Sequence, residues 1–292
     1  NIEQKPLMQI DKQGELLEDI KAFFFNFFSP TSLTNYIKNP IDVYARNILK
    51  INDLDEVEEN IAANTFGTII HDSLEELYTP LIGFELTKEK LSTMQSVVPS
   101  IVKDHFRKNL SGVDITKGKF LLVFNVITKY LLNFIEKELE QVKRHSIKIL
   151  ALEEKYEVFL DLPELDFPIK LKGTLDRVDS VDGTLRIIDY KTGRVEPKNV
   201  KITDWDKLIT DYDKAKAFQL LCYAYLYAKT KGFDTCTAGI FSFKNLNQGL
   251  FPFSEEKNTL IDKETLSKFE VQLHTLILEI CNAQIPITEK TE

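Results

Sequence analysis

Apolar residues between Gln13 and about Arg144 recur mostly at helical spacing, which predicts a helical N-terminal part. One helix is expected to begin near Asn64 and to run to Tyr78, with its apolar side formed by Ile69, Ile70, Leu74 and Leu77. A longer helix, from about Lys119 to Arg144, closes this part of the chain.

The pattern changes after Arg144, where the alternation and β-branched content of strands begin. Two runs, Ile147 to Leu160 and Ile169 to Val181, are predicted to be strands. Asp182-Gly183 follows the second run and favours a two-residue hairpin turn of type I′, in which both positions need φ above zero. Leu185 to Lys191 is then the return strand of the hairpin.

The rest of the chain alternates helix and strand. Lys214 to Lys229 is a nearly all-apolar helix, which predicts burial between other elements. A short strand, Thr237 to Phe243, and an amphipathic helix from about Lys263 to Asn282 follow. This order predicts an α/β fold, a mixed β-sheet flanked by helices with an N-terminal helical arm.

Composition is that of a globular protein with a sizeable core, since 43% of the 292 residues are hydrophobic and 28% are charged. One core remains workable up to roughly 250 to 300 residues, so one large domain is expected. The three cysteines include no CxxC pair, which excludes a disulfide framework and a zinc ribbon and favours a cytoplasmic location. The net charge of −8 argues against nucleic-acid binding over the whole surface and leaves room for a narrow basic cleft.

Targeting and motor segments are not indicated. Phe23 to Phe28 is far too short for the roughly 20 apolar residues that a bilayer needs, and no signal-peptide cleavage pattern follows it, so no membrane partner is expected. No Walker A lysine loop occurs. The chain begins at Asn1 rather than at methionine, and we expect a fragment of a longer protein.

The hairpin carries most of the candidate chemistry. Counting outward from a two-residue turn places Asp176 opposite Asp189, and two carboxylates at such a pair repel unless a cation lies between them. Oxygen-rich sites with few protein ligands suit Mg²⁺. Lys191 follows Asp189 by two residues, so both side chains leave the strand on the same face.

Two other interpretations of the hairpin remain. The same count pairs Asp179 with Arg186 on the opposite face, where a cross-strand ion pair explains both residues without catalysis. The hairpin could also be an ordinary exposed one, although Asp176 and Asp189 share their face with apolar Val178, Leu185 and Ile187. A register shift of one residue would separate the two carboxylates.

Two helices add candidate polar residues. His71 and Glu75 are four residues apart and share one strip of their helix, with Gly67 one turn earlier allowing the close approach of another backbone. Gln219 and Tyr223 have the same spacing in the apolar helix. A single histidine beside an apolar stripe is more often structural, and Gln219 could equally be a surface residue at a helix end.

Four motifs, taken in their order along the chain, resemble the nuclease domain of the RecB and AddB type within the PD-(D/E)XK superfamily. They are Gly67-Thr-Ile-Ile-His71-Asp-Ser-Leu-Glu75, Gly173-Thr-Leu-Asp176-Arg, Ile188-Asp189-Tyr-Lys191-Thr-Gly193 and Gln219-Leu-Leu-Cys-Tyr223. With the opening Ser29-Pro-Thr-Ser-Leu-Thr-Asn-Tyr36, the resemblance runs from about Ser29 to Tyr227.

The resemblance implies roles for these residues. His71, Asp176 and Asp189 would hold Mg²⁺, for which Mn²⁺ could substitute, together with the Tyr190 backbone carbonyl. Lys191 would orient or activate the attacking water. Glu75, Gln219 and Tyr223 would support the site. Asn39-Pro40 stands where relatives often have a cysteine before proline, and no downstream cysteine triplet occurs, so no iron-sulfur cluster is expected.

The expected activity is metal-dependent hydrolysis of DNA, single-stranded or at duplex ends, by the exonuclease module of a helicase-nuclease in DNA repair or recombination. A helicase domain or subunit is the expected partner, and Arg177, Arg194 and Lys198 could contact phosphates. We expect residues 1–28 to form an extension or linker, 29–145 the helical part and 146–292 the catalytic sheet. The alternatives are an inactive DNA-binding or scaffolding module of the same fold, a nuclease acting on RNA, and another metal-dependent hydrolase.

Overall fold

A computed structural model describes residues 7–14, 28–51, 63–110, 112 and 114–290. Its main helices are α2 (Pro30–Lys38), α3 (Pro40–Asn47), α4 (Ala63–Tyr78), α5 (Lys88–Asn109), α6 (Gly118–Gln141), α9 (Ala215–Thr230) and α10 (Lys263–Cys281). Shorter ones are η1 (Thr79–Leu81), α7 (Pro197–Val200), α8 (Lys207–Thr210), η2 (Tyr212–Lys214) and η3 (Phe243–Gln248). The predicted helices after Asn64, Lys119, Lys214 and Lys263 are confirmed to within a few residues.

The central sheet is mixed and has the strand order β2-β3-β4-β6-β7. Its strands are β2 (Ile147–Leu160), β3 (Ile169–Val181), β4 (Thr184–Lys191), β6 (Cys236–Ser242) and β7 (Leu250–Pro252). Within this sheet β4 and β6 run parallel, and the other neighbouring strands are antiparallel. Two small sheets pair β1 (Gln9–Ile10) with β9 (Ile287–Thr288) and β5 (Lys201–Ile202) with β8 (Ser254–Glu255).

The β3-β4 turn has the predicted geometry. Asp182 and Gly183 have φ of 50° and 86°, and Val181 pairs with Thr184. These left-handed values suit a type I′ turn, whose twist matches that of the flanking strands. The register of the two strands therefore follows from the sequence.

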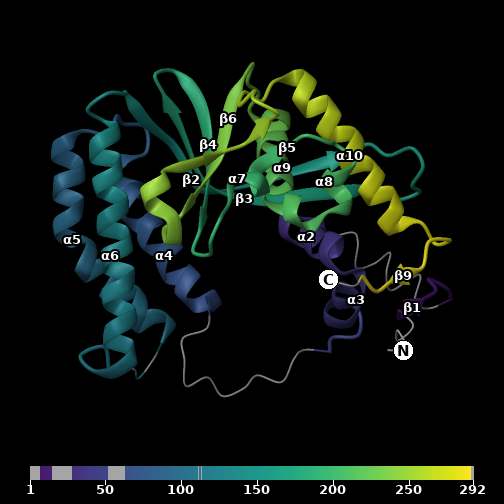
Figure 1. Ribbon diagram of the computed structural model, residues 1–292, viewed down its shortest axis with the longest axis horizontal. Helices are drawn as coiled ribbons and strands as arrows, with labels where there is room; N and C mark the ends of the chain where they lie inside the picture. The colour runs from purple at the N-terminus through teal and green to yellow at the C-terminus, as the bar shows by residue number, and fades with distance from the viewer. Residues whose placement is uncertain (1–6, 15–27, 52–62, 111, 113, 291–292) are drawn as a thin grey trace, which may run out of the picture.

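Helices cover both faces of the sheet, so the core has two parts (Figure 1). On one face α4, α5 and α6 stand side by side and pack on Ile188, while α2, α9 and α10 pack with Ile187 on the other. Helix α9 is buried along most of its length, as predicted. The result is the mixed sheet flanked by helices that the sequence predicts.

Gly173 lets two helices approach β3 closely. A Cβ atom there would lie 2.8 Å from Leu226 Cδ1 of α9 and 3.4 Å from Pro30 Cδ of α2. Asn39, between α2 and α3, accepts a hydrogen bond from the Ile41 backbone N–H with its side chain and so caps α3.

The described part of the N-terminal extension packs on the C-terminal end of the chain. Strand β1 pairs with β9, and Lys12, 2% exposed, donates hydrogen bonds from Nζ to the carbonyls of Glu279, Ile280 and Asn282. The apolar stretch Phe23 to Phe28 lies outside the described residues except for Phe28, which is buried.

One described helix, α6, is long and apolar enough to cross a membrane by length and composition alone. About a fifth (22%) of its most apolar window is buried. The C-terminal half of α6 contributes Phe134 and the buried carboxylate Glu138 to the core. The test by length and composition is passed by core helices too, so it does not assign α6 to a membrane.

Candidate active site

Three carboxylates form a row across three neighbouring strands. Leu152 and Glu154 of β2 pair with Arg177 and Leu175 of β3, which places Glu153 beside Asp176. Arg177 pairs with Ile188 of β4, and continuing that register places Asp176 beside Asp189, as the sequence predicts.

Regular cross-strand pairing is interrupted at this row: the β3-β4 ladder ends at Arg177 and Ile188, and the β2-β3 ladder skips Glu153 and Asp176 before it continues. Glu153 has a φ of 45°, which is unfavourable for a residue with a side chain. Leu152 packs on the α4-α6 side and Tyr156 on the α9 side, although four residues apart they would share a face in a regular strand. Leu175 and Val178 are three apart in β3 and yet pack on one face. The strands bend here, and the side chains of β2 and β3 therefore do not alternate regularly between the two faces of the sheet.

Helix α4 brings His71 to the row. His71 Nδ1 lies 3.4 Å from Glu153 Oε1 and 3.7 Å from Asp176 Oδ2. Its Nε2 donates to the Tyr190 carbonyl oxygen at 3.1 Å. The carbonyl proposed as a metal ligand therefore orients the imidazole, and Nδ1 faces the carboxylates.

The predicted residues Asp189 and Lys191 form an ion pair beside this group. Lys191 Nζ donates to Asp189 Oδ1 at 2.8 Å, and Asp189 is 1% exposed. The second oxygen of Asp189, Oδ2, is buried without a hydrogen-bond partner among the described residues. The Tyr190 backbone N–H donates to Asp176 Oδ2 at 2.7 Å, so β4 holds the next carboxylate in the row.

Burial and mutual repulsion shift the pKa values at the site. Burial first, and then the charge of Asp189, raise the pKa of Asp176 to about 7. Burial alone lowers the pKa of His71, but its hydrogen bond to Glu153 and the surrounding carboxylates outweigh burial and raise the pKa to about 9. Burial opposes protonation of Lys191 as well, and Asp189 and Asp176 raise its pKa nevertheless.

This donor set fits a divalent cation. One ligand atom each from His71, Glu153 and Asp176 lies within 4.8 Å of the other two. Imidazole nitrogen and carboxylate oxygen both bind divalent ions, and the orphaned Asp189 Oδ2 is an acceptor without a partner close by. A cation would also relieve the repulsion that raises the pKa of Asp176.

Gln219 and Tyr223 lie on α9, and the structure places Tyr223 against the row. Tyr223 is buried, and burial together with the carboxylates of Asp189 and Asp176 raises its pKa. Gln219 is half-buried. Both belong to one face of α9, since residues four apart share a helical strip.

Arg177 corrects one prediction, because it cannot contact a phosphate. Its side chain is fully buried, with Nη1 at 2.7 Å from Glu138 Oε1 and Nη2 at 2.6 Å from Asp179 Oδ2. Asp179 also accepts from Arg186 Nε at 2.8 Å, so the predicted Asp179–Arg186 pair is part of a larger buried network.

The other predicted contacts differ in exposure. Glu75 is exposed, and among the described residues no hydrogen bond or ion pair joins its side chain to the row. Arg194 is 74% exposed and lies 3.4 Å from Glu196. Lys198 donates to Asp213 at 2.8 Å. The close approach of another backbone that was predicted at Gly67 is not found: a Cβ atom there would meet only the Thr192 side chain, with Oγ1 at 3.8 Å, an ordinary contact.

Glu153 is the site residue that the sequence analysis missed. It lies in a run with Glu154 and Glu157, and a regular strand would alternate their side chains without distinguishing Glu153. Its position follows from the bend in β2 and the register with β3. The presence of three acids in a strand otherwise rich in apolar residues was the signal available.

The metal-free Asp176→Asn protein is expected to gain stability over the unchanged protein as pH rises from 4 to 6.5. A carboxyl whose folded pKa, about 7, exceeds its unfolded value of 3.8 stabilises the fold below pH 3.8 and loses that contribution toward pH 7. In the unfolded chain His71, with a pKa of 6.5, loses its proton only toward the upper end of this window. The difference should grow by up to ~3 kcal/mol, measured by urea unfolding in EDTA.

Divalent cations should reverse this order, because they bind the carboxylate form of Asp176. Asp234→Asn, a change at a distant exposed carboxylate, is the control. A pH-independent difference for Asp176→Asn would contradict the raised pKa.

Comparison of the sequence with known protein families and with individual proteins finds one family and several relatives. The model of the PD-(D/E)XK nuclease superfamily matches residues 27–292. An uncharacterized protein of Rickettsia bellii is 26% identical over 178 residues, which are 61% of this chain and 20% of the relative. An uncharacterized protein of Rickettsia conorii is 27% identical over 205 residues, 67% of this chain and 23% of the relative. The chain thus spans about a fifth of the length of these relatives.

Proposed function

The chain belongs to the PD-(D/E)XK nuclease superfamily, and we propose that it hydrolyses phosphodiester bonds of DNA with the help of a divalent cation. The observation that carries this proposal is the meeting of His71, Glu153 and Asp176 next to the Asp189–Lys191 pair. Members of this superfamily are usually metal-dependent nucleases. Mg²⁺, with Mn²⁺ as a substitute, is the proposed ion.

His71, Glu153 and Asp176 would hold the cation, with Asp189 as a further acceptor at its edge. When bound, Mg²⁺ supplies Lewis-acid stabilisation of phosphate oxygens and lowers the pKa of water. The Tyr190 carbonyl keeps the His71 ring in one orientation through Nε2.

Lys191 is proposed to stabilise the negative charge that develops on the phosphate during hydrolysis. Its ammonium is held by Asp189 Oδ1 at 2.8 Å and stays protonated, since the nearby carboxylates raise its pKa. A fixed, mostly buried cation stabilises developing charge more strongly than a solvated one. Asp189 therefore has two roles, to position Lys191 and to face the cation.

The biological setting is proposed to be a helicase-nuclease of the RecB or AddB kind that processes DNA ends in repair or recombination. Support comes from the order of the four sequence motifs and from the length of the Rickettsia relatives, in which the matched part is 20–23% of the chain. Such a nuclease module would act on DNA that a motor domain or partner subunit delivers.

The test is degradation of linear single-stranded and double-stranded DNA, and of RNA, with Mg²⁺, with Mn²⁺ and with EDTA. The unchanged protein should cleave DNA only with a cation. Glu153→Gln should lower the rate at least about 100-fold, because it removes a charged ligand. Glu154→Gln, at the next residue of the same strand and paired with Lys231 at 3.4 Å, is the matched control.

Two outcomes would count against the proposal. A protein that binds DNA and cleaves no nucleic acid with either ion would be the inactive module of this fold. Equal rates for Glu153→Gln and Glu154→Gln would show that Glu153 does not hold the cation.

A further inference from the structure

A cavity of about 480 Å³ opens beside the row of carboxylates, between the N-terminus of α2 and the β2-β3 hairpin. Lys155, Lys172, Thr174 and Tyr223 contribute to its lining, and Ser29 and Pro30 form the opposite wall. Strand geometry gives the spacing between the residues that line the cavity and the carboxylates of the row. Lys155 follows Glu153 by two residues and Thr174 precedes Asp176 by two, a step of about 6.6 Å along each strand.

Beyond the row, two successive cross-strand pairs of β2 and β3 lie at this cavity. Lys155 pairs with Thr174, and Glu157 pairs with Lys172. Pairs two residues apart project to the same side of a hairpin. Lys155 and Lys172 are thus presented one after the other, at increasing distance from Glu153 and Asp176.

The charge of the cavity is positive, although the chain as a whole carries −8. Glu157, the acidic residue in its lining, is bound by Lys170 Nζ at 3.2 Å. Lys155 and Lys172 have no carboxylate within ion-pair distance among the residues described. Two unpaired ammonium groups next to a row of acids suit an anion that the acids by themselves would repel.

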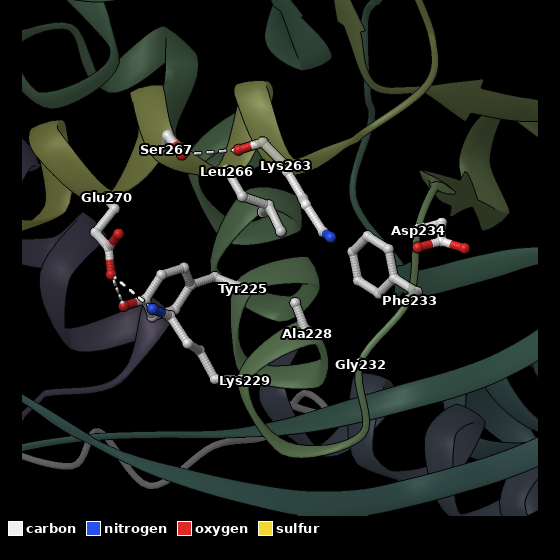
Figure 2. Close-up of a pocket in the computed structure, with 10 residues that line it drawn as sticks. All are labelled: Tyr225, Ala228, Lys229, Gly232, Phe233, Asp234, Lys263, Leu266, Ser267 and Glu270. Atoms are coloured by element: carbon white, nitrogen blue, oxygen red, sulfur yellow. Dashed lines mark hydrogen bonds and ion pairs between the residues drawn. The ribbon is translucent and has the colours of Figure 1, made fainter.

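A second cavity, of about 570 Å³ between α9 and α10, shows the contrast (Figure 2). There Lys229 Nζ lies 2.9 Å from Glu270 Oε1, and the Tyr225 hydroxyl donates to the same oxygen at 2.5 Å. Lys229 and Glu270 pair with each other, and the other two charged residues of the lining, Lys263 and Asp234, are of opposite sign, so the lining carries no net charge. It therefore offers less to a phosphate than the cavity at α2.

Tyr223 joins the cavity to the site. It lines the cavity, and it lies on α9, which packs on β3 and β4, the strands that carry Asp176 and Asp189. The cavity and the row of carboxylates are therefore built from the same strands, β2 and β3, and from the helix that packs on them.

We propose that this cavity binds the sugar-phosphate backbone of the nucleic-acid strand on one side of the scissile bond, with Lys155 and Lys172 contacting its phosphates. The proposal rests on the proposed nuclease function and names the subsite that aligns the strand. Contacts to the backbone position a strand without selecting its sequence, so cleavage should depend little on sequence through this subsite.

The experiment compares Lys155→Ala/Lys172→Ala with the unchanged protein and with a control of equal charge, Lys257→Ala/Lys263→Ala. Lys263 lines the second cavity, and neither control lysine has a role in the site. The substrate is a fluorescently labelled single-stranded oligonucleotide. Cleavage is followed with Mg²⁺ over a range of salt concentrations, and binding is followed by anisotropy in EDTA.

The cavity variant should raise KM and the dissociation constant about 10-fold or more and change kcat little. Because each lost phosphate contact on a single strand lowers the slope of log affinity against log salt by about 0.7, the slope should fall by about 1.4. Lys155→Arg/Lys172→Arg should restore both values, and melting temperatures should match throughout.

The outcomes separate the two proposals. If the unchanged protein cleaves and the cavity variant keeps its KM and salt slope, the subsite is overturned and the nuclease stands. An equal loss of affinity in the cavity variant and the control variant would also overturn the subsite, since it would show that binding depends on the total surface charge and not on this cavity. If the unchanged protein neither binds nor cleaves any nucleic acid, the nuclease function itself fails.

Discussion

Lys191→Ala is expected to lower the rate of DNA cleavage by about 10²- to 10³-fold while cation binding persists. The ammonium would act on the charge that develops in the transition state, whereas His71, Glu153 and Asp176 form the cation group and are unchanged. Single-turnover cleavage with Mg²⁺ measures the first effect, and calorimetric titration with Mn²⁺ measures the second. Asp176→Ala should instead lose both.

Lys191→Ala leaves the carboxylate of Asp189, 1% exposed, without its cationic partner. Some stability of the metal-free protein should therefore be lost. Asp189→Asn/Lys191→Ala removes that unpaired charge and should recover the stability without the activity. Cleavage by Lys191→Ala within about threefold of the unchanged rate would contradict the catalytic role and reduce Lys191 to a partner of Asp189.

Arg177→Ala is expected to destabilise the fold by roughly 3 to 5 kcal/mol, because it leaves the carboxylate of Glu138 buried and unpaired. Arg177 is fully buried among Glu138 at 2.7 Å, Asp179 at 2.6 Å and the ring of Tyr78, 5.1 Å from its guanidinium carbon. The Tyr78 hydroxyl donates to Glu138. Urea unfolding in EDTA measures the loss.

Two variants test the cause of this loss. Arg194→Ala removes an arginine that is 74% exposed and should change stability by no more than about 0.5 kcal/mol. Arg177→Met/Glu138→Leu removes both charges and should cost less than Arg177→Ala alone, since Asp179 keeps Arg186 as its partner. A loss below about 1 kcal/mol for Arg177→Ala would show that the buried network is not needed for stability.

This network also joins the parts that build the site. Glu138 belongs to α6, Tyr78 to α4 and Arg177 to β3. Helix α4 carries His71, and β3 carries Asp176 one residue before Arg177. The buried charges therefore fasten the helix that supplies the imidazole to the strand that supplies the carboxylate.

The sequence by itself determined the elements of the fold and the hairpin register. Two-residue and 3.6-residue periods decide which side chains are buried, and the Asp182-Gly183 turn fixes which residues face each other. Asp176, Asp189 and Lys191 could be found in this way because their relation depends on a local turn. His71 could be named through its motif, although no local rule brings α4 to the sheet.

Only the tertiary structure decided the rest. Glu153 reaches the row because β2 bends at this residue, which has a φ of 45°. A strand with regular alternation, as assumed from the sequence, would not distinguish Glu153 from the neighbouring acids. Arg177 follows Asp176 directly and was expected at the surface, but the packing of α4 and α6 buries that face completely. Local periodicity predicts the face of a strand on which each side chain lies. What covers that side depends on contacts between residues far apart in the chain, which no short-range pattern records.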